Sequence, residues 1–454
     1  MSEDMYWGGM WADGSTVSWL SLTLAQRQLG SGSATLPGWL RWHDEQPPLD
    51  WLLDPVRFTK TLTALAVVDA WRTVTTTQVA KFTGFDIAKP YSQFWAAMWH
   101  SGLLDVGFAS AGLLWTRGLR APYVLLRPAQ TKVFEQQVAP LLTYAEHLAV
   151  TGGTPWMVSR QADRHNVLCN QLALHAAHIP AVGVVHGEKW GNAGVLGFDS
   201  VGMPRPTDTG QLALDSTQAS ADLVVVRKDG LKIAVELTAS TSSTFAPKVK
   251  RWAHVMSLSP LERSGLVVLF VNASPPERYT QINKKVRQAI SDAVQEAPAA
   301  DKKMLASRIG YAGWQEWFPA LDTHTDAGVL FSSQTPPSVS GGSWGTANFL
   351  DLNYLPLSPN PALLSPMSNS GLSAWVPHQL RTTGIDPQLW RELLELNGFN
   401  HLPTPTPTRP ERGRKGRKSG WASGGVQAAL MPKRLTHPLP AHVRNNWREI
   451  YGKK

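Results

Sequence analysis

The spacing of hydrophobic residues changes along the chain, from a helical period in residues 55–128 to an α/β pattern in residues 146–330. The stretch "KTLTALAVVDAWRTV" places Leu62, Leu65 and Ala66 on one face of a predicted helix. A shorter helix is predicted over "TTTQVAKFTGF", where threonines cap its start and Gly84 ends it.

A third helix is predicted in "AKPYSQFWAAMWHSGLLDV", with Phe94, Trp95 and Met98 facing inward and Ser92 and His100 on a separate polar face. Two strand-like runs, "LLDVGFAS" and "LLWTRGLR", follow it. Three helices and a β-hairpin are the order of a winged helix-turn-helix, in which a helix enters the major groove of duplex DNA. The side chains that we expect to contact DNA here are Lys89, Ser92, Gln93, His100, Arg117 and Arg120.

Residues 146–330 give an α/β order. A helix in "RHNVLCNQLALHAAH" precedes a strand and loop in "AVGVVHGEKWGNAGVLGF", and the hairpin "ADLVVVRKDGLKIAVELTAS" follows. The helix "PKVKRWAHVMSL" should bury Val249, Trp252 and Met256, and the strand "SGLVVLFVNAS" should be buried on both faces. This order predicts an αββαβ core like that of restriction endonucleases, and the chain as a whole is predicted to be a mixed α+β protein.

The hairpin carries two carboxylates that its geometry brings together. If its turn centres on Asp229, Asp222 and Glu236 lie directly opposite on one sheet face, with Cβ atoms roughly 5 Å apart. Two carboxylates this close repel each other unless a positive charge lies between them. Mg²⁺, which prefers oxygen ligands, would supply that charge, and Asp222 and Glu236 are the metal ligands that we expect if a metal binds.

The position beside Glu236 argues against catalysis. Thr238 points to the same face of the sheet, where metal-dependent nucleases of this geometry usually carry a lysine. The nearest substitutes are Lys248 and Lys250 on the next helix. We therefore treat Asp222, Glu236, Thr238 and Lys248 as a candidate remnant site, with no cofactor, or Mg²⁺ if the site is active. The alternative is a pair of solvated acids at strand ends.

Together these motifs resemble the replication-relaxation proteins of actinobacterial plasmids and other mobile elements. Those proteins join an N-terminal winged helix to a domain of the PD-(D/E)xK nuclease type. The matching stretches are "RHNVLCNQLAL", "SADLVVV" and "IAVELTASTSSTFAPKVKRW", within roughly residues 55–290. The resemblance carries over Asp222, Glu236, Thr238, Thr241, Lys248 and, more loosely, His165 and Asn170. Two departures, Ser220-Ala221 in place of a proline before the aspartate and Thr238 in place of an aspartate, imply weakened catalysis.

Composition favours an intracellular location. Among 454 residues there is a single cysteine, Cys169, which excludes an internal disulfide framework and fits a reducing compartment. The N-terminus has early acidic residues and no basic signal-peptide region. The longest strongly apolar run, residues 266–271, is too short to span a bilayer. We expect a cytoplasmic protein without a membrane partner.

The net charge of +9 is concentrated in two segments. Residues 401–454 hold twelve Lys/Arg and two acidic residues, and residues 55–130 hold eight Lys/Arg and three aspartates. Such clusters indicate a polyanionic partner. The tail residues expected to contact DNA are Arg412, Arg414, Lys415, Arg417 and Lys418.

The predicted organisation has five parts. They are a Trp-rich arm (1–54), a winged helix (55–145), a nuclease-like domain (146–330), a Pro/Ser/Gly-rich linker (331–405) with a short helix at 387–396, and a basic tail (406–454).

The sequence predicts a DNA-binding accessory protein of a mobile genetic element, acting in replication, mobilisation or their control. Its expected partners are double-stranded DNA and a replication or mobilisation protein. One alternative is an active Mg²⁺-dependent nuclease that nicks or cleaves DNA. A second alternative is a non-enzymatic protein-interaction or regulatory module.

Overall fold

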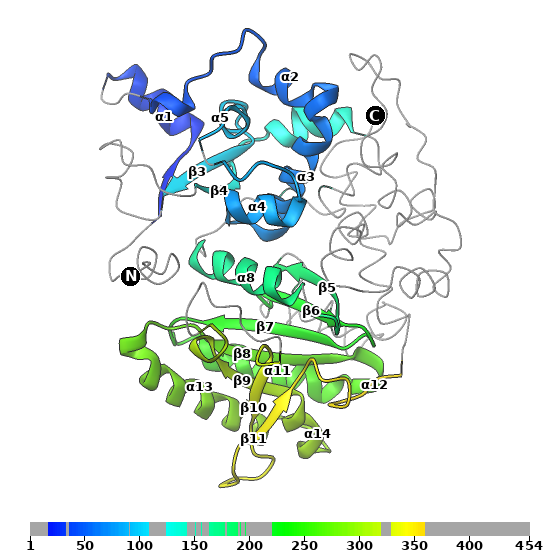
Figure 1. Cartoon of the computed structure of the whole chain (residues 1–454). Helices are drawn as coiled ribbons and strands as arrows, with labels where there is room; N and C mark the ends of the chain where they lie inside the picture. Colours follow the sequence, from blue (N-terminus) through cyan, green and yellow to red (C-terminus); the bar gives the residue numbers. More distant parts are fainter. Residues whose placement is uncertain are drawn as a thin grey trace. The chain divides into compact units, whose positions relative to one another are not determined.

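The computed structural model describes residues 17–32, 36–89, 91–108, 124–142, 150, 156, 163–177, 179–188, 191, 196, 220–318 and 328–358. The fold is mixed α+β with two sheets, as the sequence predicts (Figure 1). The described residues form two compact units, one extending to Asn170 and one beginning at Gln171, within helix α8 (Asp163–Ala176). Every helix in the described ranges is too short or too polar to cross a lipid bilayer.

The N-terminal unit is built on a four-stranded antiparallel sheet with the order β1-β3-β4-β2. Its strands are β1 (Ser18–Leu20), β2 (Val74–Thr75), β3 (Leu104–Phe108) and β4 (Leu125–Pro128). Its α-helices are α1 (Leu22–Gly30), α2 (Pro48–Leu53), α3 (Pro55–Trp71), α4 (Thr76–Thr83), α5 (Gln93–His100) and the first half of α8. Shorter turns are η1 (Gly38–Leu40), η2 (Phe134–Val138) and η3 (Ala139–Leu141).

Local signals in the sequence set the bounds of the central helices. Asp54 caps α3 by accepting a hydrogen bond from the Val56 amide at 3.0 Å. Thr75 and Gln78 form a reciprocal capping box at the start of α4. Gly84 ends α4 in the left-handed conformation, with φ of 69°. The predicted helices therefore form where their caps place them.

The described part of the segment before residue 55 packs on the later helices and the sheet of this unit, and it contains regular elements. Strand β1 pairs with β3 at the edge of the sheet. Turn η1 and helix α2 pack on α5, and Leu40 and Leu52 are fully buried. The reason is hydrophobic, because this tryptophan-rich stretch places its leucines in the same core as the later helices.

The second unit contains a seven-stranded sheet with the order β11-β10-β9-β8-β7-β6-β5. The strands are β5 (Val182–Gly187), β6 (Leu223–Arg227), β7 (Lys232–Thr238), β8 (Leu266–Asn272), β9 (Ile309–Gly313), β10 (Ser332–Thr335) and β11 (Gly345–Asn348). Strands β7, β8 and β9 run parallel, and the other neighbouring pairs are antiparallel. The unit therefore has more strands than the predicted αββαβ core. A third strand precedes α11, and three strands follow β8.

Helices cover one face of this sheet. They are α11 (Phe245–Leu258), α12 (Leu261–Ser264), α13 (Pro276–Glu296), α14 (Lys302–Ser307) and the short α15 (Trp314–Trp317). Helices α11, α13 and α14 pack on one another and on β8 and β9 (Figure 1). Val249, Trp252 and Met256 are buried, which confirms the predicted inward face of α11.

The predicted linker of residues 331–405 is wrong for its described part. Strands β10 and β11 extend the sheet beyond β9, and Phe349 and Leu350 are buried. The β10–β11 hairpin lies at the edge of the sheet and is rich in serine, glycine and proline. Because this composition has few large apolar side chains, it resembles that of a linker. The predicted helix at 387–396 and the basic tail lie outside the described residues.

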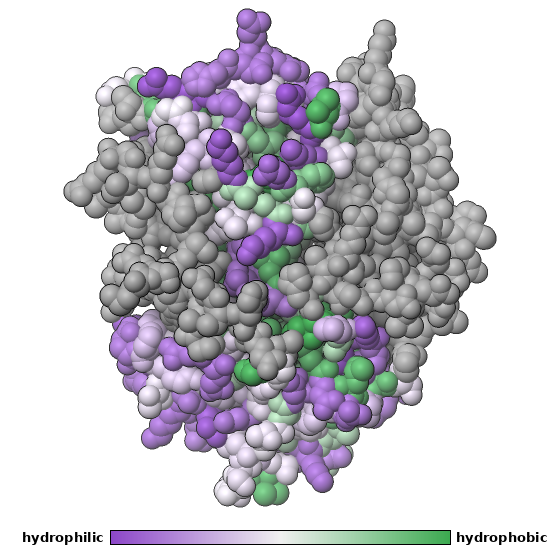
Figure 2. Space-filling view, viewed as in Figure 1, coloured by the Kyte–Doolittle hydropathy of each residue, from purple (hydrophilic) through white to green (hydrophobic). Residues whose placement is uncertain are grey.

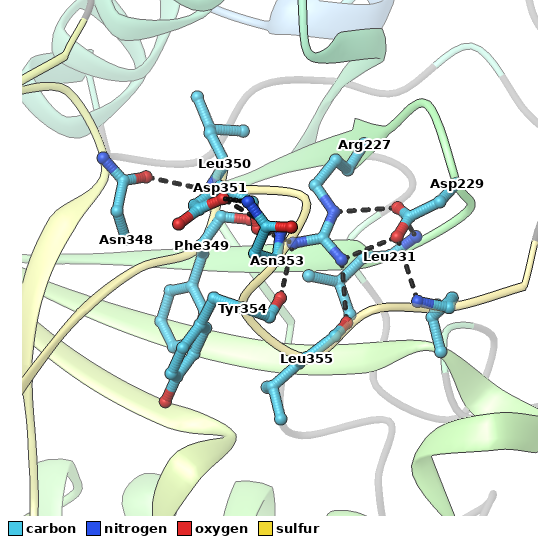
Figure 3. Close-up of polar contacts among 11 residues, drawn as sticks. Arg227, Asp229, Leu231, Asn348, Phe349, Leu350, Asp351, Asn353, Tyr354 and Leu355 are labelled. Atoms are coloured by element: carbon cyan, nitrogen blue, oxygen red, sulfur yellow. Dashed lines mark hydrogen bonds and ion pairs between the residues drawn. The ribbon is translucent and has the colours of Figure 1, made fainter.

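A buried arginine fastens the strap, residues 349–357, to the turn between β6 and β7 (Figure 3). The guanidinium of Arg227 is fully buried and forms a bidentate ion pair with Asp229, at 2.8 and 2.7 Å. Its remaining N–H groups donate to four carbonyl oxygens at 2.7–3.0 Å, those of Phe349, Asp351, Tyr354 and Leu355. Asp229 also accepts from the Leu357 amide at 3.1 Å. This clamp joins the end of the described chain to the hairpin that carries the candidate site.

Candidate functional site

The two hairpin carboxylates lie where the sequence predicts. Leu223 pairs with Val235 across β6 and β7, and Asp222 directly precedes β6, where its N–H donates to the Val235 carbonyl oxygen at 2.9 Å. Asp222 accepts a hydrogen bond from the Leu237 amide at 2.8 Å, which holds its carboxylate against β7. Directly opposed residues share a sheet face. The register of β6 and β7 is centred on Asp229, and Asp222 and Glu236 lie at the same end of this hairpin.

Helix α11 supplies both partners of Glu236. Lys248 Nζ donates to Glu236 Oε2 in a salt bridge, and Trp252 Nε1 donates to Oε1 at 2.6 Å. Lys248 and Trp252 are four residues apart, so both project from one face of the helix. The first turn of α11 thus packs over the end of β7, which is the arrangement that Lys248 requires to reach this site.

Burial dominates the electrostatics of the pair. Glu236 is 2 % exposed, and its burial raises its pKa to about 8, although the ammonium of Lys248 acts in the opposite direction. Burial alone would lower the pKa of Lys248, but the charges of Glu236 and Asp222 outweigh it and raise that pKa. Burial thus favours the protonated form of Glu236, and the neighbouring carboxylates favour the charged form of Lys248.

A third carboxylate joins the same row. Glu188 directly follows β5, whose last residue, Gly187, pairs with Leu223, and Asp222 directly precedes Leu223. Glu188 also acts on Lys248, whose pKa its charge helps to raise. Glu188 was not predicted as a site residue, because the sequence between residues 188 and 220 gives no clear signal for the end of β5. The charges of Glu188, Asp222 and Glu236 thus all act on the ammonium group of Lys248.

The chemistry of this row differs from that of an open metal site. Both oxygens of Glu236 already accept hydrogen bonds, and the ammonium of Lys248 supplies the positive charge that the carboxylates need. No group of three or more His, Cys, Asp or Glu side chains in the described ranges is arranged to hold a metal ion. Asp222 and Glu236 could act as oxygen ligands for Mg²⁺ only if Lys248 moved away from Glu236.

Of the other residues that the resemblance implies, only some lie near Glu236 and Lys248. Thr238 is buried at the end of β7, and Thr241 is half-buried in the loop before α11. Asn170 belongs to the N-terminal unit, where its amide donates to the Thr73 carbonyl oxygen at 2.8 Å. His165 is half-buried in α8. The described contacts therefore assign Asn170 a packing role.

The helix expected to read DNA is covered. Residues 94–99 of α5 are all buried, between the core and the segment formed by η1 and α2. Gln93 donates to the Arg41 carbonyl oxygen at 3.4 Å, and the ring of His100 contacts the Leu40 carbonyl oxygen. Ser92 is half-buried. The predicted polar residues of this helix are therefore half-buried, because the preceding segment packs on it.

Other candidate DNA contacts are divided between exposed and undescribed positions. Lys89 is exposed in the connection between α4 and α5, and Lys81 is exposed in the last turn of α4. Lys60 lies 5.9 Å from the ring centre of Phe85 in the same connection. Arg117 and Arg120 of the predicted wing, and the five tail residues between Arg412 and Lys418, lie outside the described residues.

Comparisons of the chain with protein-family models, with curated proteins and with solved structures gave no match. The resemblance to replication-relaxation proteins stays a prediction from sequence motifs.

Proposed function

We propose that this chain is a DNA-binding accessory protein whose nuclease-like unit does not cut DNA. The observation that carries the proposal is the order α3-β2-α4-α5-β3-β4 in the N-terminal unit, with β4 paired between β2 and β3. Three helices enclosed by a small antiparallel sheet are the arrangement of a winged helix. The resemblance of the sequence motifs to replication-relaxation proteins supports a role in replication, mobilisation or their control on a mobile element.

The covered helix α5 changes the expected mode of binding. Base readout needs side chains that reach the groove edges, and residues 94–99 are buried. The exposed cations near the α4–α5 connection, Lys81 and Lys89, are suited to phosphates. The basic tail adds further positive charge. The proposed binding is therefore largely independent of sequence and strongly dependent on salt.

The second unit supports a nuclease-like origin without cleavage. A helix, three antiparallel strands, helix α11 and the parallel strand β8 follow the order of that class, and Asp222 and Glu236 occupy the expected strand ends. Lys248 and Trp252 engage both oxygens of Glu236. We expect this pairing to stabilise the unit in place of a metal.

Binding is tested with the full chain and a short labelled duplex by fluorescence anisotropy across a salt series. Lys81→Gln/Lys89→Gln should lower the slope of log affinity against log salt by about 2, because each lysine contacts about one phosphate. The matched control, Arg27→Gln/Lys132→Gln, removes the same charge from exposed positions of the same unit and should change the slope little. Equal effects of the two double variants would refute docking at the α4–α5 connection.

The tail is tested by truncation after Thr408. Loss of its basic residues should flatten the salt dependence for every duplex sequence. An absence of duplex binding by the full chain at low salt would instead favour the protein-interaction alternative.

The nuclease alternative is tested with plasmid and oligonucleotide DNA in Mg²⁺ or Mn²⁺. We expect no cleavage, because Lys248 and Trp252 already engage both oxygens of Glu236, which leaves that carboxylate unable to hold a metal ion unless Lys248 moves away. Robust cleavage that is lost in both Asp222→Ala and Glu236→Ala would establish the alternative.

A further inference from the structure

The outer side of the second unit carries a polar groove that the nuclease-like site does not use. It has a volume of about 370 Å³ and lies along α13, beside the loop that joins β10 to β11. Its residues on α13 include Asn283, Lys284, Arg287, Gln288 and Ser291, and Trp344 of the loop lines the other side. The surface over α13 and its neighbours, at the lower left of Figure 2, is largely hydrophilic.

The groove is positively charged. Between Arg278 and Ser291, helix α13 carries four basic residues and no acidic residue. Lys284 and Arg287 line the groove, and neither makes an ion pair within the described ranges. They are three residues apart, so they lie about 4.5 Å apart along the helix axis on one side of it. Two uncompensated cations on one helix face favour an anionic ligand.

Aromatic rings hold one of these cations in place. The guanidinium carbon of Arg287 lies 4.4 Å from the ring centre of Trp344. Trp344 in turn contacts Tyr311 edge-on, with ring centres 6.3 Å apart. A stacked guanidinium is fixed and partly desolvated, yet its N–H groups still point outward in a fork that matches phosphate.

The groove also contains a buried acceptor that lacks a donor. Among the described residues, none donates a hydrogen bond to the buried Oδ1 of Asn283. A phosphate has no hydrogen to donate at neutral pH, so this oxygen fits a second part of the ligand, one with N–H groups. Cations, an aromatic ring and an amide oxygen together match the phosphate and base of a nucleotide.

We infer that this groove binds single-stranded nucleic acid, with phosphates on Lys284 and Arg287 and a base edge on Asn283. A single strand is preferred to a duplex because the amide and the indole lie inside the groove, where they reach bases only when these are unpaired. The inference uses residues that the proposed duplex binding does not use, so each can fail without the other.

The test uses the full chain, labelled oligothymidine or oligouridine, and fluorescence anisotropy at several salt concentrations. Lys284→Gln/Arg287→Gln removes both groove cations. The matched control is Arg278→Gln/Lys285→Gln, which removes the same charge from exposed positions of α13 outside the groove. The groove variant should lower the salt slope by about 1.4, at about 0.7 per phosphate on a single strand, and the control should lower it much less.

Two further measurements locate the ligand. Trp344→Ala should weaken binding about 5- to 150-fold, the loss typical of one base–aromatic stack, whereas Trp344→Phe should retain most of the affinity. Photocrosslinking of an oligonucleotide that carries 5-iodouracil, followed by mass spectrometry, should label peptides of α13 or of the β10–β11 loop.

The inference is refuted by any of three results. They are equal losses in the groove and control variants, crosslinks confined to other parts of the chain, or competition by duplex as effective as by single strands. The groove variant retains Lys81, Lys89 and the basic tail, so unchanged duplex affinity in this variant would show that the two sites are separate.

Discussion

The buried pair of Glu236 and Lys248 makes a prediction about the order of three variants. Removing one partner of a buried ion pair costs about 3–5 kcal/mol, because the other charge is left without compensation. Lys248→Met leaves the carboxyl of Glu236, 2 % exposed, with only the Trp252 N–H. The side chain of Lys248 is 31 % exposed, so screening reduces the effect. We expect a loss of about 3 kcal/mol in the free energy of opening.

The reverse change should cost less. Glu236→Gln leaves the charge on Lys248, which has access to solvent and to the field of Asp222. The loss is then about one charge-assisted hydrogen bond, about 1.5 kcal/mol. The double variant carries no buried charge at this position. It should therefore be more stable than Lys248→Met alone, although it has one more substitution.

Hydrogen–deuterium exchange of peptides from β7 and α11, read by mass spectrometry, measures the free energy of local opening in each variant. It does not require two-state unfolding of the whole chain. A loss of about 3 kcal/mol is about a hundredfold faster exchange. Equal costs for the two single variants, or a double variant no better than Lys248→Met, would refute the reasoning.

The pH dependence of the same peptides has a definite sign. The pKa of Glu236 is raised in the folded chain, to about 8, so the folded state binds a proton more tightly than the unfolded chain does. The stability linked to this proton is fully present below about pH 4.5 and is lost as the pH rises through about 8. The deficit of Lys248→Met should accordingly be smaller near pH 5 than near pH 8.

Three further predictions concern other parts of the fold. Arg227→Lys cannot reproduce the forked hydrogen bonds to Asp229 and to the carbonyl groups of the strap. It should lower the free energy of opening of residues 349–357 by about 3–5 kcal/mol, seen as faster hydrogen exchange there. Unchanged exchange would contradict the role of the clamp. Burial lowers the pKa of His100, so stability should fall as the pH drops below about 6.5, with faster exchange of η1 and α5 peptides that is absent in His100→Gln. Gly310→Ala places a Cβ 2.5 Å from the Phe349 ring and should lower the free energy of unfolding, measured by heat or denaturant, by about 1–3 kcal/mol. An unchanged free energy of unfolding would show that the strap can move to accommodate the Cβ.

Local signals explain why much of the candidate site could be predicted from the sequence. Asp222 and Glu236 are equally spaced from Asp229, so a tight turn there fixes their register. The apolar stripe of α11 determined that Trp252 faces inward, and the same helix face brings Lys248 over β7. Register and helical period are properties of neighbouring residues, so a single sequence contains them.

The features that were not predicted depend on contacts between distant segments. Arg227 stands in "RKDG", which reads as a polar turn, and its burial arises from carbonyl groups that lie 122–128 residues later. Helix α5 has a polar residue at each end, Gln93 and His100, and nothing in its own pattern reveals that η1 and α2 cover it. Strands β10 and β11 form because the exposed edge of β9 offers hydrogen bonds, although their composition resembles that of a linker.

The Arg227 clamp also sets the order of events during synthesis of the chain. The hairpin that carries Arg227 leaves the ribosome well before Leu355, which follows it by 128 residues. At a synthesis rate of about 5–20 residues per second, the carbonyl partners of the guanidinium are made about 6–26 s after Arg227 itself. During that interval it has only Asp229 to pair with, and one face of the sheet lacks Phe349 and Leu350. The second unit therefore completes its folding late, after the last of its described strands, β11, has been made.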